Sequence, residues 1–351
     1  MEIKKRNMIS NNEITGYDAL WDSMLKCQKS VRWKPAVKDF IINSPELIHS
    51  MHTRLVNGTW IDGIPRPIKI MYPKKRDGLS INFTDRVYQR SINDNVLYPE
   101  MTKHFVYDNS ACQIGKGPRF ARRRIKEQLW KYYCNHGSEG YVLRVDITQY
   151  FKNIQHDLSM TTISRYLPDD ISDSISSILE KQHINGDTGY NPGSQMVQIV
   201  ALSILNSTDH YIKEKLRIKV YHRYNDDLFI VHKDKEYLEY CLERITGIFE
   251  SLGFKINRKK TAITKLTDGF EFLGFTYHMT NTGKVIMTVS SENVKRERRK
   301  LKRMVAKSKR GELPKSKVDE SFNGWKTYVS EGNSTKLVWK MDKYYSELWR
   351  S

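Results

Sequence analysis

Apolar segments that end in aspartate, in the middle of the chain, restrict its fold more than any other feature. Residues 142–146 read Val-Leu-Arg-Val-Asp, and two apolar runs within residues 220–231 are joined by Asn225, Asp226 and Asp227. These short apolar runs predict three strands, and the last two form a hairpin with the acids at its bend. Asn and Asp tolerate turn conformations, so a simple acidic turn is the alternative interpretation of this segment alone.

The net positive charge of the chain indicates that these aspartates have a function beyond forming a turn. Lys and Arg number 59 against 40 acidic residues, a formal net charge of +19, which favours a polyanionic partner such as nucleic acid. Carboxylates that meet at one sheet edge repel each other unless cations neutralise them. Carboxylate oxygens suit Mg²⁺, and two such ions would support an in-line phosphoryl displacement of the kind that polymerases catalyse.

The 351 residues predict two or three folding units and enough apolar material for a buried core. Strands separated by helices, with one tight hairpin, favour an α+β fold with helices on one face of the sheet. The expected helices are 14–57 (several), 83–98, 118–133, 171–182, 194–216, 235–252 and a basic helical region after Ser290. The expected strands are 68–72, 141–147, 218–232 (the hairpin), one near Lys255, 272–278 and 284–287. A turn is expected at 74–78 and a loop at 185–193.

The sequence predicts a cytoplasmic location. Its four cysteines lie far apart, without the spacing of a disulfide framework or a zinc site. No window approaches the roughly 18 apolar residues of a membrane span, and the N-terminus lacks a signal-peptide core. Membrane partners are therefore not expected.

Several segments resemble, in the same order, the sequence blocks of reverse transcriptases. Residues 144–151 (Arg-Val-Asp-Ile-Thr-Gln-Tyr-Phe) resemble motif A, and residues 223–227 (Arg-Tyr-Asn-Asp-Asp) resemble the Y-x-D-D of motif C. The further blocks are 74–90 in the fingers, 111–117 upstream of motif A, 193–198 (motif B), 257–261 (motif D) and 269–275 (motif E). The chain resembles bacterial enzymes of the retroelement, diversity-generating and phage-defence types.

This resemblance implies an RNA-directed DNA polymerase (a nucleotidyltransferase) with a right-hand α+β fold of fingers, palm and thumb. The palm would hold an RRM-like antiparallel sheet, and the thumb would be helical. The expected boundaries are 1–139 for N-terminal helices and fingers, 140–289 for the palm, in which fingers elements are interleaved, and 290–351 for a basic thumb.

The resemblance also implies the catalytic residues. Asp146, Ile147, Asp226 and Asp227 would hold two Mg²⁺ ions, with Mn²⁺ as a substitute. Lys260 would act as a general acid toward the leaving pyrophosphate. Lys259 competes with Lys260 for this role, and an ordinary surface lysine is the alternative.

Nucleotide binding is expected from the fingers block and from motifs A and B. Among the cations of residues 74–76 and Arg86, Lys75 and Arg86 are the preferred triphosphate ligands, with a solvated turn as the alternative. Phe151, beside Tyr150, would leave no room for a ribose 2′-hydroxyl and so favour dNTPs over rNTPs. Gln198 resembles the motif B glutamine of bacterial enzymes.

Contacts with nucleic acid are expected in three places. Gly193 would let the backbone approach the base pair, and Tyr224 belongs to motif C. The segment 291–310 carries ten Lys or Arg and two Glu, so that Arg296, Arg299, Lys300 and Arg303 would neutralise phosphates of a template duplex. The aromatic residues that follow are expected to form the core of the thumb: Trp325, Tyr328, Trp339, Tyr344, Tyr345 and Trp349.

The sequence thus predicts an enzyme that binds an RNA template, dNTPs and a DNA product. A partner noncoding RNA is expected, in phage defence or in a retroelement, and an accessory protein or a homo-oligomer stays open. One alternative is template-independent or repetitive DNA synthesis at the same site. Another is a catalytically dead RNA-binding scaffold, which the presence of all three aspartates disfavours.

Overall fold

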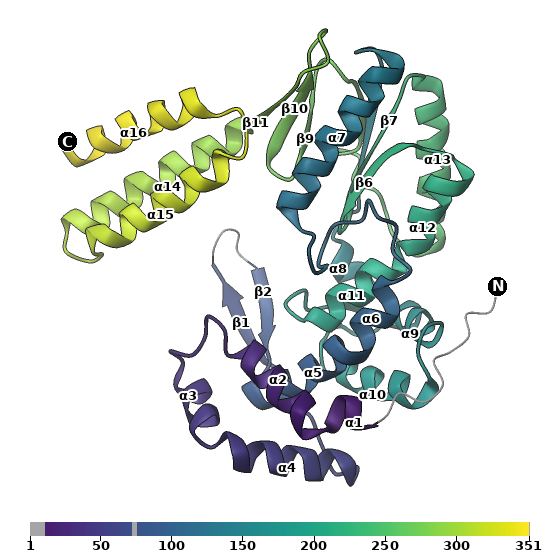
Figure 1. The fold of residues 1–351 in the computed structure, drawn as a ribbon, viewed down its shortest axis with the longest axis vertical. Helices are drawn as coiled ribbons and strands as arrows, with labels where there is room; N and C mark the ends of the chain where they lie inside the picture. The colour runs from purple at the N-terminus through teal and green to yellow at the C-terminus, as the bar shows by residue number, and fades with distance from the viewer. Residues whose placement is uncertain (1–10, 72–75, 351) are drawn as a thin grey trace.

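The protein is described here by a computed structural model that covers residues 11–71 and 76–350 (Figure 1). The N-terminal helices form one end of the molecule, the main sheet lies toward the other end, and the last three helices extend to one side. Lys74 and Lys75 of the fingers block lie outside the described residues, so the structure says nothing of the triphosphate role predicted for Lys75.

The main sheet has four strands in the order β6-β7-β3-β8, and every neighbouring pair is antiparallel. Along the chain, β3 (Tyr141–Asp146) is followed by helices, then by β6 (Val220–Tyr224) and β7 (Asp227–His232), by a helix, and by β8 (Ala262–Lys265). This is the β-α-β-β-α-β arrangement, and it agrees with the antiparallel sheet that the sequence predicts.

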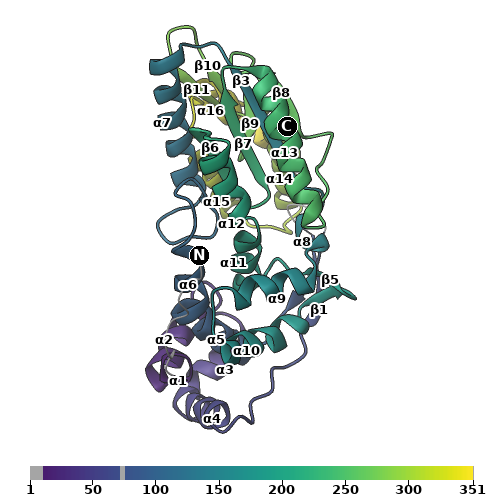
Figure 2. The ribbon, with the colours of Figure 1, turned by 90° about the vertical axis from the view of Figure 1, so that its right-hand side faces the viewer.

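The sheet is covered on both faces, which corrects the expectation of helices on one face only. Leu143 and Ile230 belong to one core cluster with residues of α13 (Lys235–Ser251). Val142 and Phe229, which alternate with them, belong to a second cluster with residues of α7 (Pro118–His136). Figure 2 shows α7 and α13 on opposite sides of the sheet. The alternation of side chains along a strand supplies both faces with apolar residues.

The N-terminal part confirms the expected helices: α1 (Asn11–Thr15), α2 (Tyr17–Cys27), α3 (Pro35–Ile42) and α4 (Ser44–Val56). The turn predicted at 74–78 is wrong for its second half. Residues 76–78 belong to β2 (Arg76–Ser80), which pairs with β1 (Arg66–Ile70) in antiparallel register. Gly78 fits here because its missing side chain leaves room for the side chain of Ile70.

Helix 83–98 is longer than predicted. It comprises α5 (Phe83–Ile92), the π-helical segment η1 (Asn93–Leu97) and α6 (Tyr98–Thr102). The helix expected at 171–182 is α10 (Asp169–Glu180), and the one expected at 194–216 is divided into α11 (Gln195–Ile204), α12 (Asn206–His210) and η2 (Tyr211–Lys215).

Other expectations need correction. The loop predicted at 185–193 contains the hairpin β4 (His183–Asn185) and β5 (Thr188–Tyr190), whose short polar strands carry no alternating pattern. The strand expected near Lys255 is only a single bridge between Ile147 and Ile256, and β8 lies further along the chain. Two short helices were not anticipated, α8 (Tyr150–Asn153) and α9 (His156–Ser164).

A second sheet connects the main sheet to the C-terminal helices. Its strands are β9 (Phe270–Phe272), β10 (Phe275–Met279) and β11 (Val285–Val289), in the order β11-β10-β9. The rings of Phe229 and Phe272 lie 5.1 Å apart between centroids, and those of Phe229 and Phe270 lie 4.9 Å apart. Phe229 therefore joins the two sheets through aromatic packing.

The C-terminal helices are α14 (Ser291–Lys309), α15 (Lys315–Val329) and α16 (Thr335–Arg350). Trp325 is buried among them, and Tyr328, Tyr344, Tyr345 and Trp349 pack against the same cluster, as the sequence predicts. Trp339 is the exception: 67% of its surface is exposed, because it lies on an outer face of α16. Within residues 11–71 and 76–350, no helix has the length and apolar character needed to cross a bilayer.

Replacing Phe229 by Ala should lower the free energy of unfolding by about 3–5 kcal/mol, because it opens a cavity between the two sheets. Urea denaturation of the purified protein measures this change. Trp339→Ala is the matched control and should change the value by no more than about 0.5 kcal/mol. Equal effects of the two substitutions would contradict the packing described for Phe229.

Candidate active site

The acidic hairpin has a two-residue turn. Tyr224 and Asp227 are the last paired residues of β6 and β7, and Asn225 and Asp226 form the turn between them. Asn225 adopts a left-handed conformation with φ of 56°, which Asn tolerates better than most residues. The turn therefore places Asp226 and Asp227 at one end of the sheet.

The pairing of β3 with β7 brings the third acid to the same place. Asp146, the last residue of β3, is the direct partner of Asp227 in the antiparallel register. The two residues share the sheet face of Val142 and Phe229, since side chains alternate along each strand. The structure thus places the three acidic residues that the sequence singled out at the same end of the sheet.

Burial makes these carboxylates costly to ionise. Loss of hydration is the largest cause that raises the pKa of Asp226, and the charge of Asp146 adds to it. Loss of hydration also raises the pKa of Asp227 to about 7, against a lowering effect of Arg144. Asp227 Oδ1 accepts no hydrogen bond within the described part of the chain, and the Arg144 guanidinium lies 3.8 Å away.

Lys260 reaches the site from the loop after α13. Its Nζ donates a hydrogen bond to Asp146 Oδ1 at 2.9 Å. The backbone N–H of Asn257 donates to the Asp146 carbonyl at 2.7 Å, which fixes this loop against the end of β3. Lys259 makes no such contact with Asp146 among the interactions of the described residues, so the geometry favours Lys260 over Lys259.

The donor set fits a hard divalent cation. Carboxylate oxygens are the ligands that Mg²⁺ prefers. Burial raises the pKa of Asp226 and of Asp227, and the buried Asp227 Oδ1 accepts no hydrogen bond within the described residues. The fit rests on the chemistry of these side chains, since no group of three His, Cys, Asp or Glu in residues 11–71 and 76–350 is arranged as an assembled metal site. Ile147 is 2% exposed, and its hydrocarbon side chain has no ligand atom, so only its backbone carbonyl could contribute.

The two aromatic residues after Asp146 have different surroundings. Tyr150, predicted to bind the nucleotide, is buried, and its hydroxyl donates to the carbonyl of Ala201 at 2.6 Å. Phe151 is partly exposed, with its ring centroid 5.5 Å from that of Tyr150. Of the pair, only Phe151 can face a sugar.

Motif B is held by contacts that the sequence did not reveal. Gln198 Nε2 donates to the carbonyl of Pro192 at 2.8 Å, and the Cys112 thiol donates to Gln198 Oε1 at 3.2 Å. Gly193 N–H donates to Asn191 Oδ1 at 3.3 Å, at the start of α11. Gln198 therefore has a fixed orientation next to the acidic hairpin.

A pocket of about 300 Å³ lies between the N-terminal helices and the start of α11, and Arg86 and Gly193 are among its lining residues. Lys26 and Arg90 also line it, and Arg90 Nη1 donates to Gln195 Oε1 at 3.0 Å. These two cations were not predicted as site residues, because each lies within an ordinary helical pattern and only the fold brings them to motif B.

The residues predicted to contact nucleic acid differ in how exposed their side chains are. Arg296, Arg299 and Arg303 are exposed along α14. Lys300 is 14% exposed and forms an ion pair with the buried Glu297 at 2.8 Å, so its surroundings differ from those of the three exposed arginines. Tyr224 is half-buried and packs against both core clusters, which leaves only part of its ring accessible.

The block upstream of motif A packs against β6. Asn109 forms a parallel bridge with Arg223, and Ser110 N–H donates to the Arg223 carbonyl at 3.1 Å. The Ser110 hydroxyl lies 2.8 Å from Nε2 of His222, a fully buried residue of β6. Residues 108–112 thus support the strand that leads into the acidic turn.

A model of the reverse transcriptase (RNA-dependent DNA polymerase) family matches residues 78–277, which are 200 of the 351 residues. The chain belongs to the reverse transcriptase family. The matched residues include the acidic hairpin, its partner strand β3 and the motif B helix, while α14 lies beyond them.

Two individual proteins resemble this reverse transcriptase. Protein YkfC of Escherichia coli (strain K12) is 24% identical over 255 residues, which are 60% of this chain and 66% of YkfC. A chain from the structure of Candida albicans telomerase with a TWJ fragment of telomeric RNA has a TM-score of 0.47 and 12% identity. That alignment covers 65% of this chain and 46% of the telomerase chain, so the chain spans less than two thirds of either relative.

His222 should make the stability of this reverse transcriptase sensitive to acid. Burial lowers the pKa of His222 from 6.5 to about 4. Between these values the unfolded state binds more protons than the folded state, so the stabilising contribution is lost as pH falls from about 6.5 to about 4. The full effect is about 3 kcal/mol.

The measurement is urea denaturation between pH 4 and pH 7 for the wild type and for His222→Gln. We expect the stability advantage of the wild type to shrink toward pH 4. His136→Gln, at an exposed position of α7, is the control and should show no such trend. A difference between wild type and His222→Gln that stays constant with pH would contradict the assignment.

Proposed function

We propose that this protein is an RNA-directed DNA polymerase that joins dNTPs to a primer end on an RNA template. One observation carries the proposal: in a chain of the reverse transcriptase family, Asp146 and Asp227 are direct cross-strand partners, with Asp226 beside them in the turn. Carboxylates from separate strands at one sheet end are the ligand arrangement that phosphoryl transfer requires.

Asp146, Asp226, Asp227 and the Ile147 carbonyl would hold Mg²⁺, or Mn²⁺ in its place. When bound, the ions would lower the pKa of the attacking hydroxyl and stabilise charge on the leaving oxygen. The chain's own residues prepare this site: burial of the carboxylates raises their affinity for a cation, and Lys260, 59% exposed, holds a proton on Nζ beside Asp146 that pyrophosphate could receive.

Nucleotide selection would depend on Phe151, Gln198 and Arg86. Phe151 would exclude the 2′-hydroxyl of a ribonucleotide. The oriented amide of Gln198 and the exposed Arg86 at the pocket near α11 support contacts with the incoming dNTP. Lys75 remains a candidate triphosphate ligand from the sequence alone.

Different segments of the chain would bind the nucleotide, catalyse its addition and hold the duplex. We assign residues 1–139 to N-terminal helices and fingers, 140–289 to the palm and 290–351 to the thumb. The exposed Arg296, Arg299 and Arg303 of α14 support phosphate contacts along a template–product duplex. Tyr224 and Gly193 would contact nucleic acid near the acidic hairpin.

The resemblance to bacterial retroelement enzymes supports a noncoding RNA as the natural template, in phage defence or in a retroelement. All four cysteines are unpaired thiols, which is in keeping with a reducing compartment. The RNA that copurifies from cells would identify the template. Sequencing of the DNA product would separate templated copying from template-independent or repetitive synthesis.

Asp226→Asn and Asp227→Asn should each reduce primer extension by about 1000-fold, because each removes several kcal/mol of transition-state stabilisation. The assay uses purified protein, Mg²⁺, dNTPs and a DNA primer on an RNA template. Asp268→Asn, in the exposed turn after β8, should extend normally, and all variants should keep their melting temperature. Full activity of either hairpin variant would refute the site assignment.

Phe151→Ala should lower the preference for dNTPs over rNTPs by on the order of 100-fold, equivalent to about 2–3 kcal/mol. The ratio of kcat/KM for a dNTP and the matching rNTP measures it. Tyr150→Phe is the paired control: it removes the hydrogen bond to Ala201 and should leave this ratio unchanged. Unaltered discrimination in Phe151→Ala would show that another group excludes the 2′-hydroxyl.

A further inference from the structure

Arg223, the residue before Tyr224 in the hairpin, is a fully buried arginine. Its side chain is 1% exposed, and that of Asp209 on α12, its ion-pair partner, is 0% exposed. Burying two charges removes their hydration, and an apolar pair of similar volume often serves stability equally well or better. The presence of charge at this position therefore calls for an explanation beyond stability.

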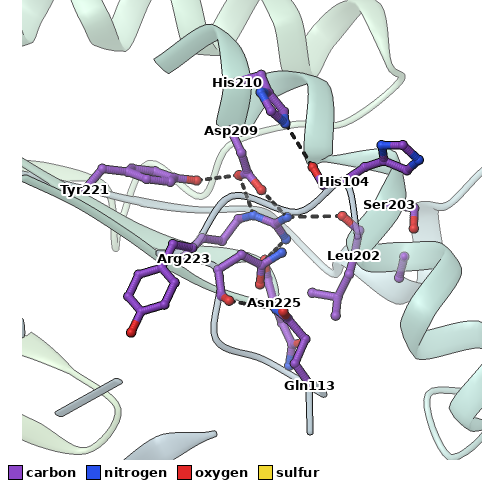
Figure 3. A network of polar contacts seen from close by, with 12 residues as sticks. His104, Gln113, Leu202, Ser203, Asp209, His210, Tyr221, Arg223 and Asn225 are labelled. Carbon is purple, nitrogen blue, oxygen red and sulfur yellow. Dashed lines mark hydrogen bonds and ion pairs between the residues drawn. The ribbon is translucent and has the colours of Figure 1, made fainter. Parts of the chain in front are cut away.

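The ion pair has a defined bidentate geometry (Figure 3). Arg223 Nε donates to Asp209 Oδ1 at 2.6 Å, and Nη2 donates to Asp209 Oδ2 at 2.5 Å. The Tyr221 hydroxyl donates to the same Asp209 Oδ1 at 2.5 Å. A planar guanidinium held in this way has no freedom to turn, so the direction of its remaining donors is fixed.

Those remaining donors reach two backbone carbonyls of the active site. Nη2 donates to Leu202 O at 3.1 Å, in the last turn of α11. Nη1 donates to Asn225 O at 2.9 Å. That carbonyl belongs to the peptide that joins Asn225, in its left-handed conformation, to Asp226.

The neighbouring carbonyl of α11 is held from motif A. Tyr150 donates to Ala201 O, one residue before Leu202. Side chains from motif A and motif C therefore both donate hydrogen bonds to carbonyls in the last turn of α11, the helix that carries Gln195 and Gln198. Arg223 is the group that connects this helix end to the acidic turn.

We propose that Arg223, held by Asp209, is a positioning residue that fixes the peptide before Asp226 and so aims the Asp226 carboxylate at the divalent cation. The inference rests on the proposed function and deepens it. Arg223 touches neither substrate nor cation; it acts through the backbone of Asn225.

The test separates positioning from stability. The triple variant Arg223→Met, Asp209→Leu, Tyr221→Phe replaces the buried polar cluster by apolar groups and leaves no unpaired charge. We expect it to keep its melting temperature within a few degrees and to bind the RNA–DNA duplex as the wild type does. Its single-turnover rate of nucleotide addition should fall by about 10- to 100-fold, as expected for a small misplacement of a catalytic group.

A second readout does not depend on activity. Binding of Mn²⁺ alone, measured by electron paramagnetic resonance, should weaken about tenfold in the triple variant, and the Mg²⁺ concentration for half-maximal extension should rise in parallel. A purely structural role of Arg223 would move neither value. Arg244→Met, at an exposed position of α13, is the matched control and should match the wild type in both.

Arg223→Lys decides the matter if the triple variant does not fold. A lysine keeps the charge opposite Asp209 but cannot bond Asp209, Leu202 O and Asn225 O together, so its Mn²⁺ affinity should fall as well. Wild-type Mn²⁺ affinity and rate in the folded variant would overturn the inference. An inactive wild type would refute the proposed function instead, and the Mn²⁺ measurement would still test Arg223.

Discussion

The register between β3 and β7 is the constraint on which the active site depends. It pairs Asp146 with Asp227, and it is itself fixed by the apolar residues behind them. Leu143 and Ile230 face one core cluster, while Val142 and Phe229 face the other. A slip of one residue would turn every side chain of β3 to the opposite face, and the two acids would part. Packing on both faces of the sheet therefore protects the geometry of two carboxylates at its end.

Three basic side chains in different surroundings reduce the repulsion between those carboxylates. Lys260 arrives from a loop and is largely exposed, so a competing ion can displace it at little cost. Arg144 stands within the sheet beside Asp227, and Arg223 is buried behind the turn. The exchangeable charge lies on the solvent side, and the permanent charges lie on the protein side. Under the proposed function, this arrangement would let a cation that arrives with the substrate replace Lys260 without disturbing the hairpin.

The strands, the hairpin and the three acids could be predicted from the sequence, because each depends on a pattern of neighbouring residues. The apolar run before Asp146 and the turn chemistry of Asn225 are visible without any knowledge of the fold. Arg90, Cys112 and Asp209 were not found, since their importance comes from contacts across about 14 to 105 residues of chain. Two charged residues in apolar strands, Arg144 and Arg223, were a signal that could have been used, because an arginine in such a position needs a buried partner.

The surroundings of individual side chains could not be predicted from the sequence. Lys300 looked like its basic neighbours in the sequence, yet Glu297 one turn earlier neutralises it. Tyr150 looked equivalent to Phe151, yet its hydroxyl finds a helix carbonyl inside the protein. Periodicity alone could not reveal either contact, because Lys300 lies in the middle of a basic helix and Tyr150 begins a helix of only four residues.

The C-terminal helices are joined to the sheets by a few specific links. Met287 and Asn333 exchange two hydrogen bonds, at 2.7 and 2.9 Å, and Arg122 pairs with Glu331 at 2.5 Å. The helices also share an apolar core with the second sheet, where the rings of Phe275 and Tyr328 lie 5.0 Å apart between centroids. Under the proposed function, α14 would hold the duplex while the acidic turn forms the new bond, so that selection could adjust how long a product stays bound without altering how fast each nucleotide is added.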